Sequence, residues 1–583
     1  MVHFTVLKAS ADMKRYYAPD YYLERAETRA FFGGALADRL GLGAFDRAHF
    51  HALCDGLHPL TGAKLTPGRK GNARAGWDVT IDGPKDLGVL LGLGLDDRIV
   101  PQVIERAGRD LMQLIERDAF TRVRVGGADR DRPTGAIVYS GIVHLTARPV
   151  GTKVDVQPHI HFLVANATWD AVEGRYKALQ LQPFVGNGAR EARPFYTAFL
   201  NNQMARYLHE LGYRTEPDRK NQSFRVVGVP ESVRKEFSQR THKIEAVAAT
   251  LERQKRAFVG DPTATLDPAK KGELGARTRE PKRPGQTWAS LLDHWAGRVS
   301  AAERRAVMET VIRSRRAPHA LGPDRARDAV SYALAHLTER ETVVTERRII
   351  TEALKHGLGS VTVRTLTAEL NRRPDVIRRT VGGTPLVTTT AALATERTIT
   401  AFAVKDRGRN RSLAAPGPVS QPSADSVPLT VSQHAAVRHV LTSRDRLIVV
   451  QGRAGTGKTT LTRTAVAAIE RAGLPVQMLA PSVAAPRGVL RQDGFQNANT
   501  LTAFLQDEVM QARVRGGVVW LDEAGLASAA DFAALCQAAD SLGARVVVSG
   551  DARQHNSVAA GDVFALLDRV GLPVAEVTEV RRQ

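Results

Sequence analysis

Residues 447–460 restrict the fold of this chain more than any other segment. An apolar, β-branched run at 447–450 leads into GRAGTGKTT at 452–460, and a helical pattern follows. The segment matches the phosphate-binding loop G-x-x-x-x-G-K-[ST], with the strand before it and the helix after it that the motif requires. Backbone N–H groups of such a loop surround a β-phosphate at a helix N-terminus. The sequence therefore predicts a nucleotide-binding α/β domain.

The side chains of this loop have separate predicted roles. Lys458 supplies a positive charge to the β- and γ-phosphates, and the Thr459 hydroxyl is a ligand for Mg²⁺. We therefore expect ATP with Mg²⁺ as the ligand. The candidate contacts are Gly452, Gly455, Thr456, Gly457, Lys458, Thr459 and Thr460.

Two carboxylates follow an apolar run downstream of the loop. The run at 518–521 ends in Asp522 and Glu523, and the end of a parallel strand is where Mg²⁺ and an attacking water need acidic groups. We expect Asp522 to hold the metal through water and Glu523 to polarise the nucleophile. Further β-branched runs at 476–479 and 546–548 alternate with helical patterns, which favours a parallel sheet covered by helices.

Histidines form a second cluster of candidate functional residues, in the N-terminal part of the chain. His159 and His161 lie two residues apart on a predicted strand, so both side chains project from one face. His144 ends the preceding predicted strand, and antiparallel pairing would bring it beside them. Three imidazoles leave positions open on a divalent ion such as Mg²⁺ or Mn²⁺, which suits Lewis-acid chemistry on a phosphate. Alternatively, these are ordinary half-exposed polar residues of a sheet.

Tyrosines are concentrated near the N-terminus. The whole chain has ten, yet two pairs, at 16–17 and 21–22, fall within seven residues. A phenol has a pKa of about 10 and is a poor nucleophile at neutral pH, but a metal on the phosphate and a carboxylate that accepts its proton make it competent. The alternative is that the tyrosines pack in a helix or stack on bases.

Net charge and composition indicate which kind of partner the protein binds and which cellular compartment it occupies. Lys and Arg number 82 against 61 Asp and Glu, and the formal net charge of +21 indicates a polyanionic partner. Cys54 and Cys536 are the only cysteines, which excludes a disulfide framework or a cysteine zinc site and favours the cytoplasm. The longest apolar run, 87–95, is too short to span a bilayer, so we expect no stable membrane insertion.

Two segments poor in large apolar residues divide the chain. Residues 260–286 and 405–428 are rich in Pro, Gly or charge and cannot bury a core. We expect an α+β N-terminal domain at 1–290, a small, mostly helical connector at 291–404, a flexible linker at 405–428 and an α/β P-loop domain at 429–583.

The motifs resemble those of a known family. Taken together, they are similar to the MobF-type conjugative relaxases, which join a single-strand endonuclease domain of the HUH class to a RecD-like superfamily-one helicase. The relaxase-like motifs are Tyr16-Tyr17, 76–80 with Pro84-Lys85, 157–161 and 237–245; the helicase-like ones are 429–433, the P-loop, 550–554 and 580–583. The tyrosine pairs are closer together than in the family, and residues 80–86 lack its serines.

This resemblance implies a fold and a set of roles. The N-terminal domain would be a ferredoxin-like antiparallel palm whose central strands hold the histidines, and the P-loop domain would be RecA-like. Tyr16 would nick DNA and keep a 5′-phosphotyrosine link, Tyr21 would act in later strand transfer, and Tyr17 and Tyr22 are alternates. Asp78 would accept the tyrosine proton or orient a ligand histidine. Gln433 would read adenine, while Gln554 and Arg582 would contact the γ-phosphate.

The resemblance also implies an activity and partners. It predicts a relaxase that nicks the transferred strand of single-stranded DNA at an origin of transfer, with relaxosome accessory proteins and the coupling protein of a type IV secretion system as further partners. Because the chain stops after one RecA-like domain, we expect ATP binding, ATPase activity only in a longer form, and no unwinding. Two alternatives stay open: an ATP-dependent DNA motor remnant whose N-terminal domain only binds DNA, and a binding protein without catalysis.

Overall fold

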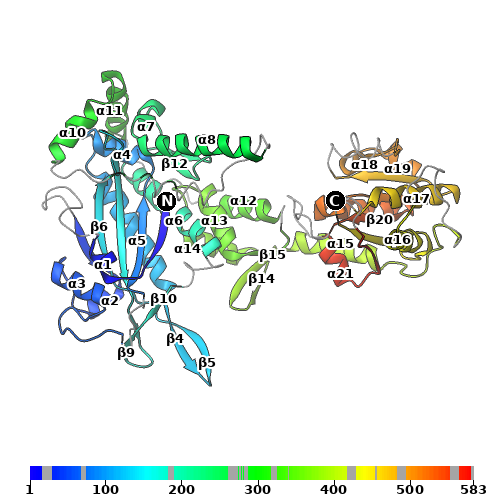
Figure 1. Ribbon diagram of the computed structural model, residues 1–583, viewed down its shortest axis with the longest axis horizontal. Helices are drawn as coiled ribbons and strands as arrows, with labels where there is room; N and C mark the ends of the chain where they lie inside the picture. The colour runs from blue at the N-terminus through cyan, green and yellow to red at the C-terminus, as the bar shows by residue number, and fades with distance from the viewer. Residues whose placement is uncertain are drawn as a thin grey trace. The chain divides into compact units, whose positions relative to one another are not determined.

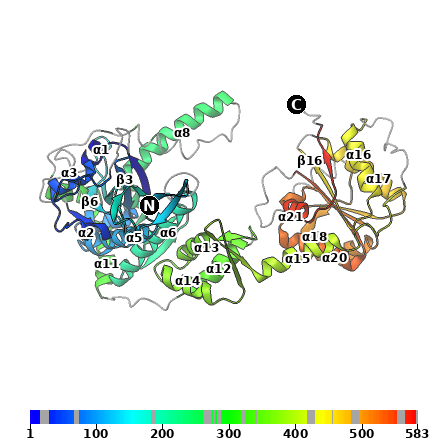
Figure 2. The same ribbon diagram turned by 90° about the horizontal axis from the view of Figure 1, so that it is seen from below.

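The computed structural model of the 583-residue chain forms two compact units, which are drawn in Figures 1 and 2. One unit is Met1–Val330 with Ile350–Glu369, and the other is Ser331–Ile349 with Leu370–Gln583. The structure describes residues 1–15, 29–66, 74–181, 189–259, 274, 278, 280, 287–316, 325–338, 341–415, 428–453, 456–481, 494–551 and 563–579. Each unit has its own core and is described by itself.

A five-stranded antiparallel sheet forms the centre of the first unit. Its strand order is β1-β3-β7-β6-β2, so the strands with the predicted site residues lie in the middle. Alternation along β3 and β7 sends Val79, Ile81 and Phe162 to a fully buried face and the polar side chains to the other face. This confirms the predicted antiparallel palm. The strands are β1 Val2–Leu7, β2 Ala30–Gly33, β3 Gly76–Asp82, β6 Tyr139–Thr146 and β7 Val156–Ala165.

Helices cover the apolar face of this sheet. Helix α5 approaches closely because Gly108 has no side chain: a Cβ there would lie 2.8 Å from both Ile81 and Phe162. Helix α4 packs on β7, and α5 packs on α6. The helices of this layer are α4 Lys85–Gly92, the π-helix η3 Ile99–Glu105, α5 Arg106–Arg117 and α6 Ala189–Glu210.

Shorter elements surround the sheet and its helical layer. They include a three-stranded antiparallel sheet in the order β10-β4-β5 and two two-stranded antiparallel sheets, β8–β9 and β11–β12. Their bounds are α1 Ser10–Lys14, α2 Ala35–Arg39, α3 Arg47–Asp55, β4 Phe120–Val125, β5 Ala128–Pro133, β8 Thr168–Asp170, β9 Arg175–Lys177, β10 Leu179–Gln180, β11 Thr215–Asp218, β12 Ser223–Val226, α7 Glu231–Glu236 and α8 Gln239–Val259.

The first unit continues past residue 290. Helices α10 (Trp288–Ala296) and α11 (Ala301–Arg316) belong to it. Trp295 is fully buried, and its indole Nε1 donates a hydrogen bond of 2.8 Å to the Val154 carbonyl oxygen. The expected domain boundary therefore falls inside α10, because the apolar face of that helix is buried against the unit that precedes it.

A six-stranded parallel sheet forms the centre of the second unit, in the order β18-β17-β19-β20-β16-β21. All four strands predicted for it are present, which confirms the α/β fold. The strands are β16 Leu447–Gly452, β17 Val476–Ala480, β18 Asn499–Thr500, β19 Val518–Leu521, β20 Arg545–Gly550 and β21 Val574–Val577. The helices are α16 Val431–Thr442, α17 Lys458–Arg471, α18 Leu501–Gln506, α19 Glu508–Arg513, the 3₁₀ turn η7 Ala524–Leu526, α20 Ala529–Leu542 and α21 Val563–Arg569.

Residues before this sheet also pack into its core, which differs from the linker expected at 405–428. Helix α15 (Thr390–Val404) contributes Phe402, and the following segment contributes Leu413, which is 2 % exposed. Lys405 pairs with Asp540 at 2.7 Å. Residues 405–415 are therefore part of the second unit, because Leu413 is buried there; residues 416–427 lie outside the described chain.

The middle segment contains a small sheet as well as helices. Strands β13 (Val344–Thr345), β14 (Val376–Val381) and β15 (Thr384–Thr389) pair in the antiparallel order β13-β15-β14. Its helices are α12 Ala326–Thr338, α13 Glu346–His356 and α14 Val363–Arg372. In the described part of the chain, no helix combines the length and the apolar character that a bilayer crossing requires.

Candidate metal centre and nucleotide site

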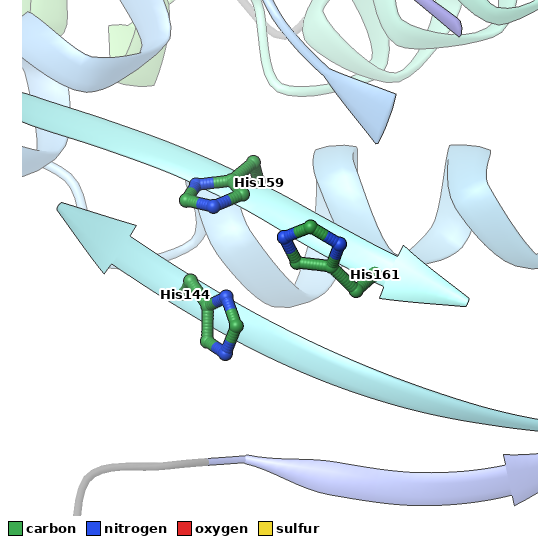
Figure 3. A group of neighbouring side chains, drawn as sticks. All are labelled: His144, His159 and His161. Carbon is green, nitrogen blue, oxygen red and sulfur yellow. The ribbon is translucent and has the colours of Figure 1, made fainter. Parts of the chain in front are cut away.

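Three histidines gather on the polar face of the central sheet, and Figure 3 shows their rings converging from two adjacent strands. His159 and His161 lie on β7, and His144 on β6 is directly opposite His159 in the antiparallel register. A β-bulge follows His144. The three ring centroids lie 5.1 to 5.3 Å apart. The predicted juxtaposition of the three imidazoles is therefore present.

Neighbouring groups fix the orientation of two of these rings. His161 Nδ1 donates to the Asp78 carboxylate, at 2.9 Å from Oδ2, and the Thr80 hydroxyl donates to Asp78 Oδ1 at 3.1 Å. His159 Nδ1 donates to the Gln157 carbonyl oxygen at 2.7 Å. With both Nδ1 atoms engaged, Nε2 of each ring is the atom left to coordinate a metal.

The donor set fits a divalent ion. One nitrogen of each histidine can be chosen so that all three lie within 4.8 Å of one another. His144 is 1 % exposed, and the other two rings are partly exposed, so the cluster is open on one side. Neutral imidazoles with a carboxylate behind one of them are a recurring arrangement at metal sites. These residues could hold a metal with room for a phosphate oxygen.

Further charged groups lie on the same face of the sheet. Asp82 is opposite His159 in the register, and the N-terminal ammonium of Met1 contacts its Oδ1 at 2.6 Å. Burial, the largest influence, would raise the pKa of the Asp82 carboxyl, but the ammonium together with His3 and His159 outweighs burial, and the pKa lies below its ordinary value. On the neighbouring strand, burial lowers the pKa of His3. Asp82 is thus held as an ion pair with the Met1 ammonium beside the cluster.

The P-loop lies between β16 and α17 in the second unit. Gly457 adopts a left-handed conformation (φ 74°) at the N-terminus of α17. Lys458 Nζ donates to the Gly452 and Arg453 carbonyl oxygens at 2.6 and 3.2 Å. Thr456 donates from its hydroxyl to the Arg453 oxygen at 2.8 Å. The lysine side chain is therefore held against the loop, next to the N-terminus of α17, and helix N-termini favour phosphate binding.

The two carboxylates at the end of β19 have different environments. Asp522 Oδ1 accepts a hydrogen bond of 2.6 Å from Ser549 Oγ, which in turn accepts one from the buried Trp520 indole at 2.9 Å. Glu523 has a left-handed backbone (φ 51°), an uncommon conformation for a non-glycine residue that is often found at functional sites. Burial and the neighbouring Asp522 raise its pKa, and Lys458 opposes this shift.

A cavity of about 340 Å³ opens beside the P-loop, at the carboxyl ends of the parallel strands. This edge is where open α/β sheets bind ligands. The cavity is lined by Gln451, Gly452, Arg453, Asp551, Glu576, Val577 and Thr578.

Gln433, the residue expected to read adenine, lies against the P-loop. Its Nε2 donates to the Thr456 carbonyl oxygen at 2.8 Å, and its Oε1 accepts from the Thr430 backbone N–H at 2.9 Å. The side chain is fully buried. In this structure both ends of the amide therefore contact backbone, so Gln433 ties the start of α16 to the phosphate-binding loop.

Comparison with known families separates the chain into two matched regions. The profile described as TrwC relaxase matches residues 5–302, more than half of the chain, and includes Asp78 and all three histidines. This chain belongs to the TrwC relaxase family. The profile described as an AAA domain matches residues 428–583. The resemblance to a conjugative relaxase joined to a P-loop domain is thereby confirmed.

Several proteins are similar to this TrwC-family chain. The multifunctional conjugation protein TraI of Escherichia coli is 28 % identical over 359 residues, which is 59 % of this chain and 19 % of TraI. The conjugal transfer protein TraA of Rhizobium radiobacter is 34 % identical over 161 residues, 27 % of this chain and 14 % of TraA. This chain therefore spans about a fifth of the length of the TraI relatives. A solved structure of the conjugative relaxase TrwC in complex with oriT DNA, metal-bound, has 24 % identity and a TM-score of 0.42 over 51 % of this chain and 97 % of that one.

Some predicted site residues of this TrwC-family chain cannot be placed. Tyr16, Tyr17, Tyr21 and Tyr22 lie outside the described residues, as do Gly455, Gln554 and Arg582. The described members of the relaxase set, Asp78 and the histidines, are together in the first unit. The described nucleotide-site members lie together in the second unit, on the P-loop and the ends of β16 and β19.

Sequence reasoning missed two contributors to the metal centre. Thr80 supplies a hydroxyl to Asp78, and the Gln157 carbonyl supports His159. Thr80 could have been found, because it is two residues from Asp78 and so shares its face of the strand. The Gln157 contact is made by backbone and leaves no signal in residue type.

Proposed function

We propose that this chain is a DNA relaxase, which nicks one strand of DNA through a tyrosine and forms a 5′-phosphotyrosine link. The observation that carries this proposal is the cluster of His144, His159 and His161, with Asp78 and Thr80 behind it. The proposed substrate is single-stranded DNA at an origin of transfer. Membership of the TrwC family and the names of the conjugation relatives support it.

The proposed reaction is a transesterification. The Tyr16 oxygen bonds to the scissile phosphorus, the bond from phosphorus to the 3′-oxygen breaks, the phenol loses its proton and the leaving strand ends in a 3′-hydroxyl. The phosphodiester energy is kept in the new link, so this step needs no ATP. Tyr21 is proposed for a second transfer step, with Tyr17 and Tyr22 as alternates.

The histidines are proposed to hold Mg²⁺ or Mn²⁺. When bound, the ion supplies Lewis-acid polarisation of the phosphate. The chain keeps the ligands oriented: Asp78 accepts from His161 Nδ1, and the Gln157 oxygen accepts from His159 Nδ1. Of the two roles expected for Asp78, the orienting one has this geometric support.

The P-loop domain is proposed to bind ATP with Mg²⁺. Lys458 and Thr459 would contact the phosphates and the metal, Asp522 would hold the metal through water, and Glu523 would polarise water. A raised pKa at Glu523 suits a group that accepts a proton. Gln554 and Arg582 are proposed as γ-phosphate contacts.

The proposal extends to the cellular setting. We infer a cytoplasmic protein that assembles with relaxosome accessory proteins and with the coupling protein of a type IV secretion system. The domain limits 1–290, 291–404, 405–428 and 429–583 stay predictions, with the differences at α10 and at 405–415 given above. The rival function is an ATP-dependent DNA motor remnant whose N-terminal domain only binds DNA.

Covalent capture tests the proposal without knowledge of the origin sequence. The full chain is incubated with Mn²⁺ and a pool of single-stranded DNA of random sequence, and the DNA that stays attached after denaturation is sequenced. We expect a related set of sequences linked through their 5′-phosphates, and their loss in Tyr16→Phe. Tyr332→Phe is the matched control, because Tyr332 is 42 % exposed on α12 and belongs to the other unit.

The possible results of this capture experiment distinguish the proposed relaxase from the DNA motor remnant. Adducts that persist in Tyr16→Phe but vanish when Tyr17, Tyr21 and Tyr22 are also replaced would assign the nucleophile to another tyrosine. If the wild type captures no DNA while still binding ATP, the motor remnant is the better account.

A further inference from the structure

The segment between the two family matches contains a complete supersecondary unit. Residues 303–427 are covered by neither match. Within them the order is helix α12, strand β13, helices α13 and α14, then the hairpin β14–β15. The last strand lies in the middle of the small sheet, between β13 and β14. This chain order and strand order are those of a winged helix, a helix-turn-helix followed by a β-hairpin.

The connection between α13 and α14 has the features of a helix-turn-helix turn. Helix α13 ends at His356 and α14 begins at Val363, and Gly359 between them has a φ of +73°. Thr362 starts α14 with a reciprocal cap: Thr365 N donates to Thr362 Oγ1, and Thr362 N donates to Thr365 Oγ1, both at 3.1 Å. The second helix of such a pair is the one that enters a DNA groove.

A buried asparagine on α6 holds this turn. Asn202 Nδ2 donates to the Val361 carbonyl oxygen, and Gly359 N donates to Asn202 Oδ1, each at 2.8 Å. Asn202 is fully buried. A Cβ at position 359 would lie 2.4 Å from the His209 ring, so glycine is needed there. The turn is therefore fixed in one geometry, and α14 starts from a rigid support.

The exposed face of α14 is basic and polar. Leu366 and Leu370 are buried, whereas the exposed positions recur at helical spacing on the other side. Arginine is the side chain that makes paired hydrogen bonds to guanine in the major groove. The exposed residues of this face are Arg364, Ala368, Asn371 and Arg372.

The hairpin continues this surface. Figure 1 shows β14 and β15 as a two-stranded ribbon, whose tip is formed by Gly382 and Gly383, both with positive φ. Arg378 donates to Asn371 Oδ1, which links the ribbon to the end of α14. Arg379 is exposed on the same strand. The ribbon therefore adds positive charge next to the end of the helix.

We propose that α14 and the β14–β15 ribbon bind double-stranded B-form DNA, with α14 in the major groove and the ribbon along the phosphate backbone. The width of the major groove of B-form DNA admits a helix, and the arginines complement the phosphates. This binding is separate from nicking, because none of its residues belongs to the metal centre or to the nucleotide site.

The test compares the binding of three nucleic acids to the full chain. Binding of a hairpin-free DNA duplex, an RNA duplex of the same sequence and a single strand is measured by fluorescence anisotropy at several salt concentrations. The variant is Arg364→Gln/Arg372→Gln/Arg379→Gln. The control is Arg304→Gln/Arg305→Gln/Arg316→Gln, which removes the same charge from exposed positions of α11. Thermal melting of each protein verifies that it is folded.

We expect the variant to weaken DNA-duplex binding at least about tenfold relative to the control, since it removes groove and phosphate contacts. The slope of log K against log salt should become shallower by about 2 to 3. Binding of the RNA duplex should equal that of the control, because the deep, narrow major groove of A-form RNA does not admit a helix. Equal losses on DNA and RNA, a loss confined to single strands, or no loss at all would overturn the proposal.

Discussion

Asp78 connects the three-histidine cluster to the rest of the sheet. Its two carboxylate oxygens accept hydrogen bonds from His161 Nδ1 and the Thr80 hydroxyl, and the side chain is almost fully buried. A buried carboxylate behind a histidine fixes the ring tautomer and makes the far nitrogen a better ligand. The hydrogen bond between His161 and Asp78 joins two strands that are far apart in sequence.

Replacing Asp78 by asparagine should weaken metal binding. The substitution keeps the size of the side chain but removes the negative charge behind His161, and loss of such a partner lowers metal affinity by about 10- to 100-fold. Titration with Mn²⁺ in the absence of nucleotide measures the affinity. Asp97→Asn is the matched control, because Asp97 is exposed outside the sheet. Unchanged affinity in Asp78→Asn would contradict the orienting role.

A second buried carboxylate predicts a pH effect on stability. Burial alone would raise the pKa of Asp96, but hydrogen bonds from Arg98 and Tyr213 and the charge of Arg98 outweigh it, so the pKa lies below its ordinary value. A depressed folded-state pKa stabilises the fold above the unfolded value of about 3.9, and this stabilisation is lost as the pH falls through the folded pKa.

Asp96→Asn should therefore melt at a lower temperature than the wild type at pH 7, since breaking a buried pair costs about 3–5 kcal/mol. The difference should shrink as the pH falls below about 4, because the carboxyl of the unfolded wild-type chain takes up a proton there while the folded one still resists protonation. Calorimetry from pH 3 to pH 7 measures both melting temperatures. A difference that is the same at pH 3 and pH 7 would show that the charge of Asp96 contributes nothing.

Among the secondary-structure elements, the long strands were easier to predict from the sequence than the small sheet or the packing of the helices. The alternation at 159–164 was enough to place two histidines on one face, and the β-branched runs gave four strands of the parallel sheet. The small sheet was missed, although Gly382-Gly383 between two β-branched runs is a hairpin signal, because the helical periodicity around it dominated. Packing of α10 and of Leu413 depends on distant partners, which no local pattern reveals.

The contribution of α10 to the relaxase unit can be measured through its tryptophans. Trp295 is fully buried and bonded to Val154 O, whereas Trp288 is only partly buried. Trp295→Ala should destabilise the first unit by about 3–5 kcal/mol through the cavity that it leaves, and Trp288→Ala should cost less. The readout is the melting transition that Mn²⁺ raises. Equal, small effects of both variants would mean that α10 is not part of this unit.

The two units have separate cores and carry separate candidate ligand sites. The first unit buries apolar residues on both faces of the five-stranded sheet, and the second buries its own on both sides of the parallel sheet. Separate domains were predicted from the sequence because the two sets of motifs are far apart in the chain. The four N-terminal tyrosines lie outside the described residues. An excess of positive charge of +21 suits a protein that handles nucleic acid.

Separate sites predict separate responses to ligands. A ligand stabilises the folded form that binds it by RT ln(1 + [L]/Kd), or about 2.7 kcal/mol at a hundredfold excess over Kd. In calorimetry, Mn²⁺ without nucleotide should raise one transition and Mg²⁺-ATP the other, and EDTA should reverse the first shift. Lys458→Ala should abolish only the ATP shift. A single transition raised equally by both ligands would contradict the division.

Pulsed electron paramagnetic resonance of Mn²⁺ can show whether the three histidines hold one divalent ion. With one equivalent of Mn²⁺ and no nucleotide, the full chain should show nitrogen couplings from imidazole ligands. These couplings should disappear in His144→Ala/His159→Ala/His161→Ala and persist in Lys458→Ala. Bound Mn²⁺ without nitrogen coupling in the wild type, or with the same coupling in the triple variant, would contradict the account.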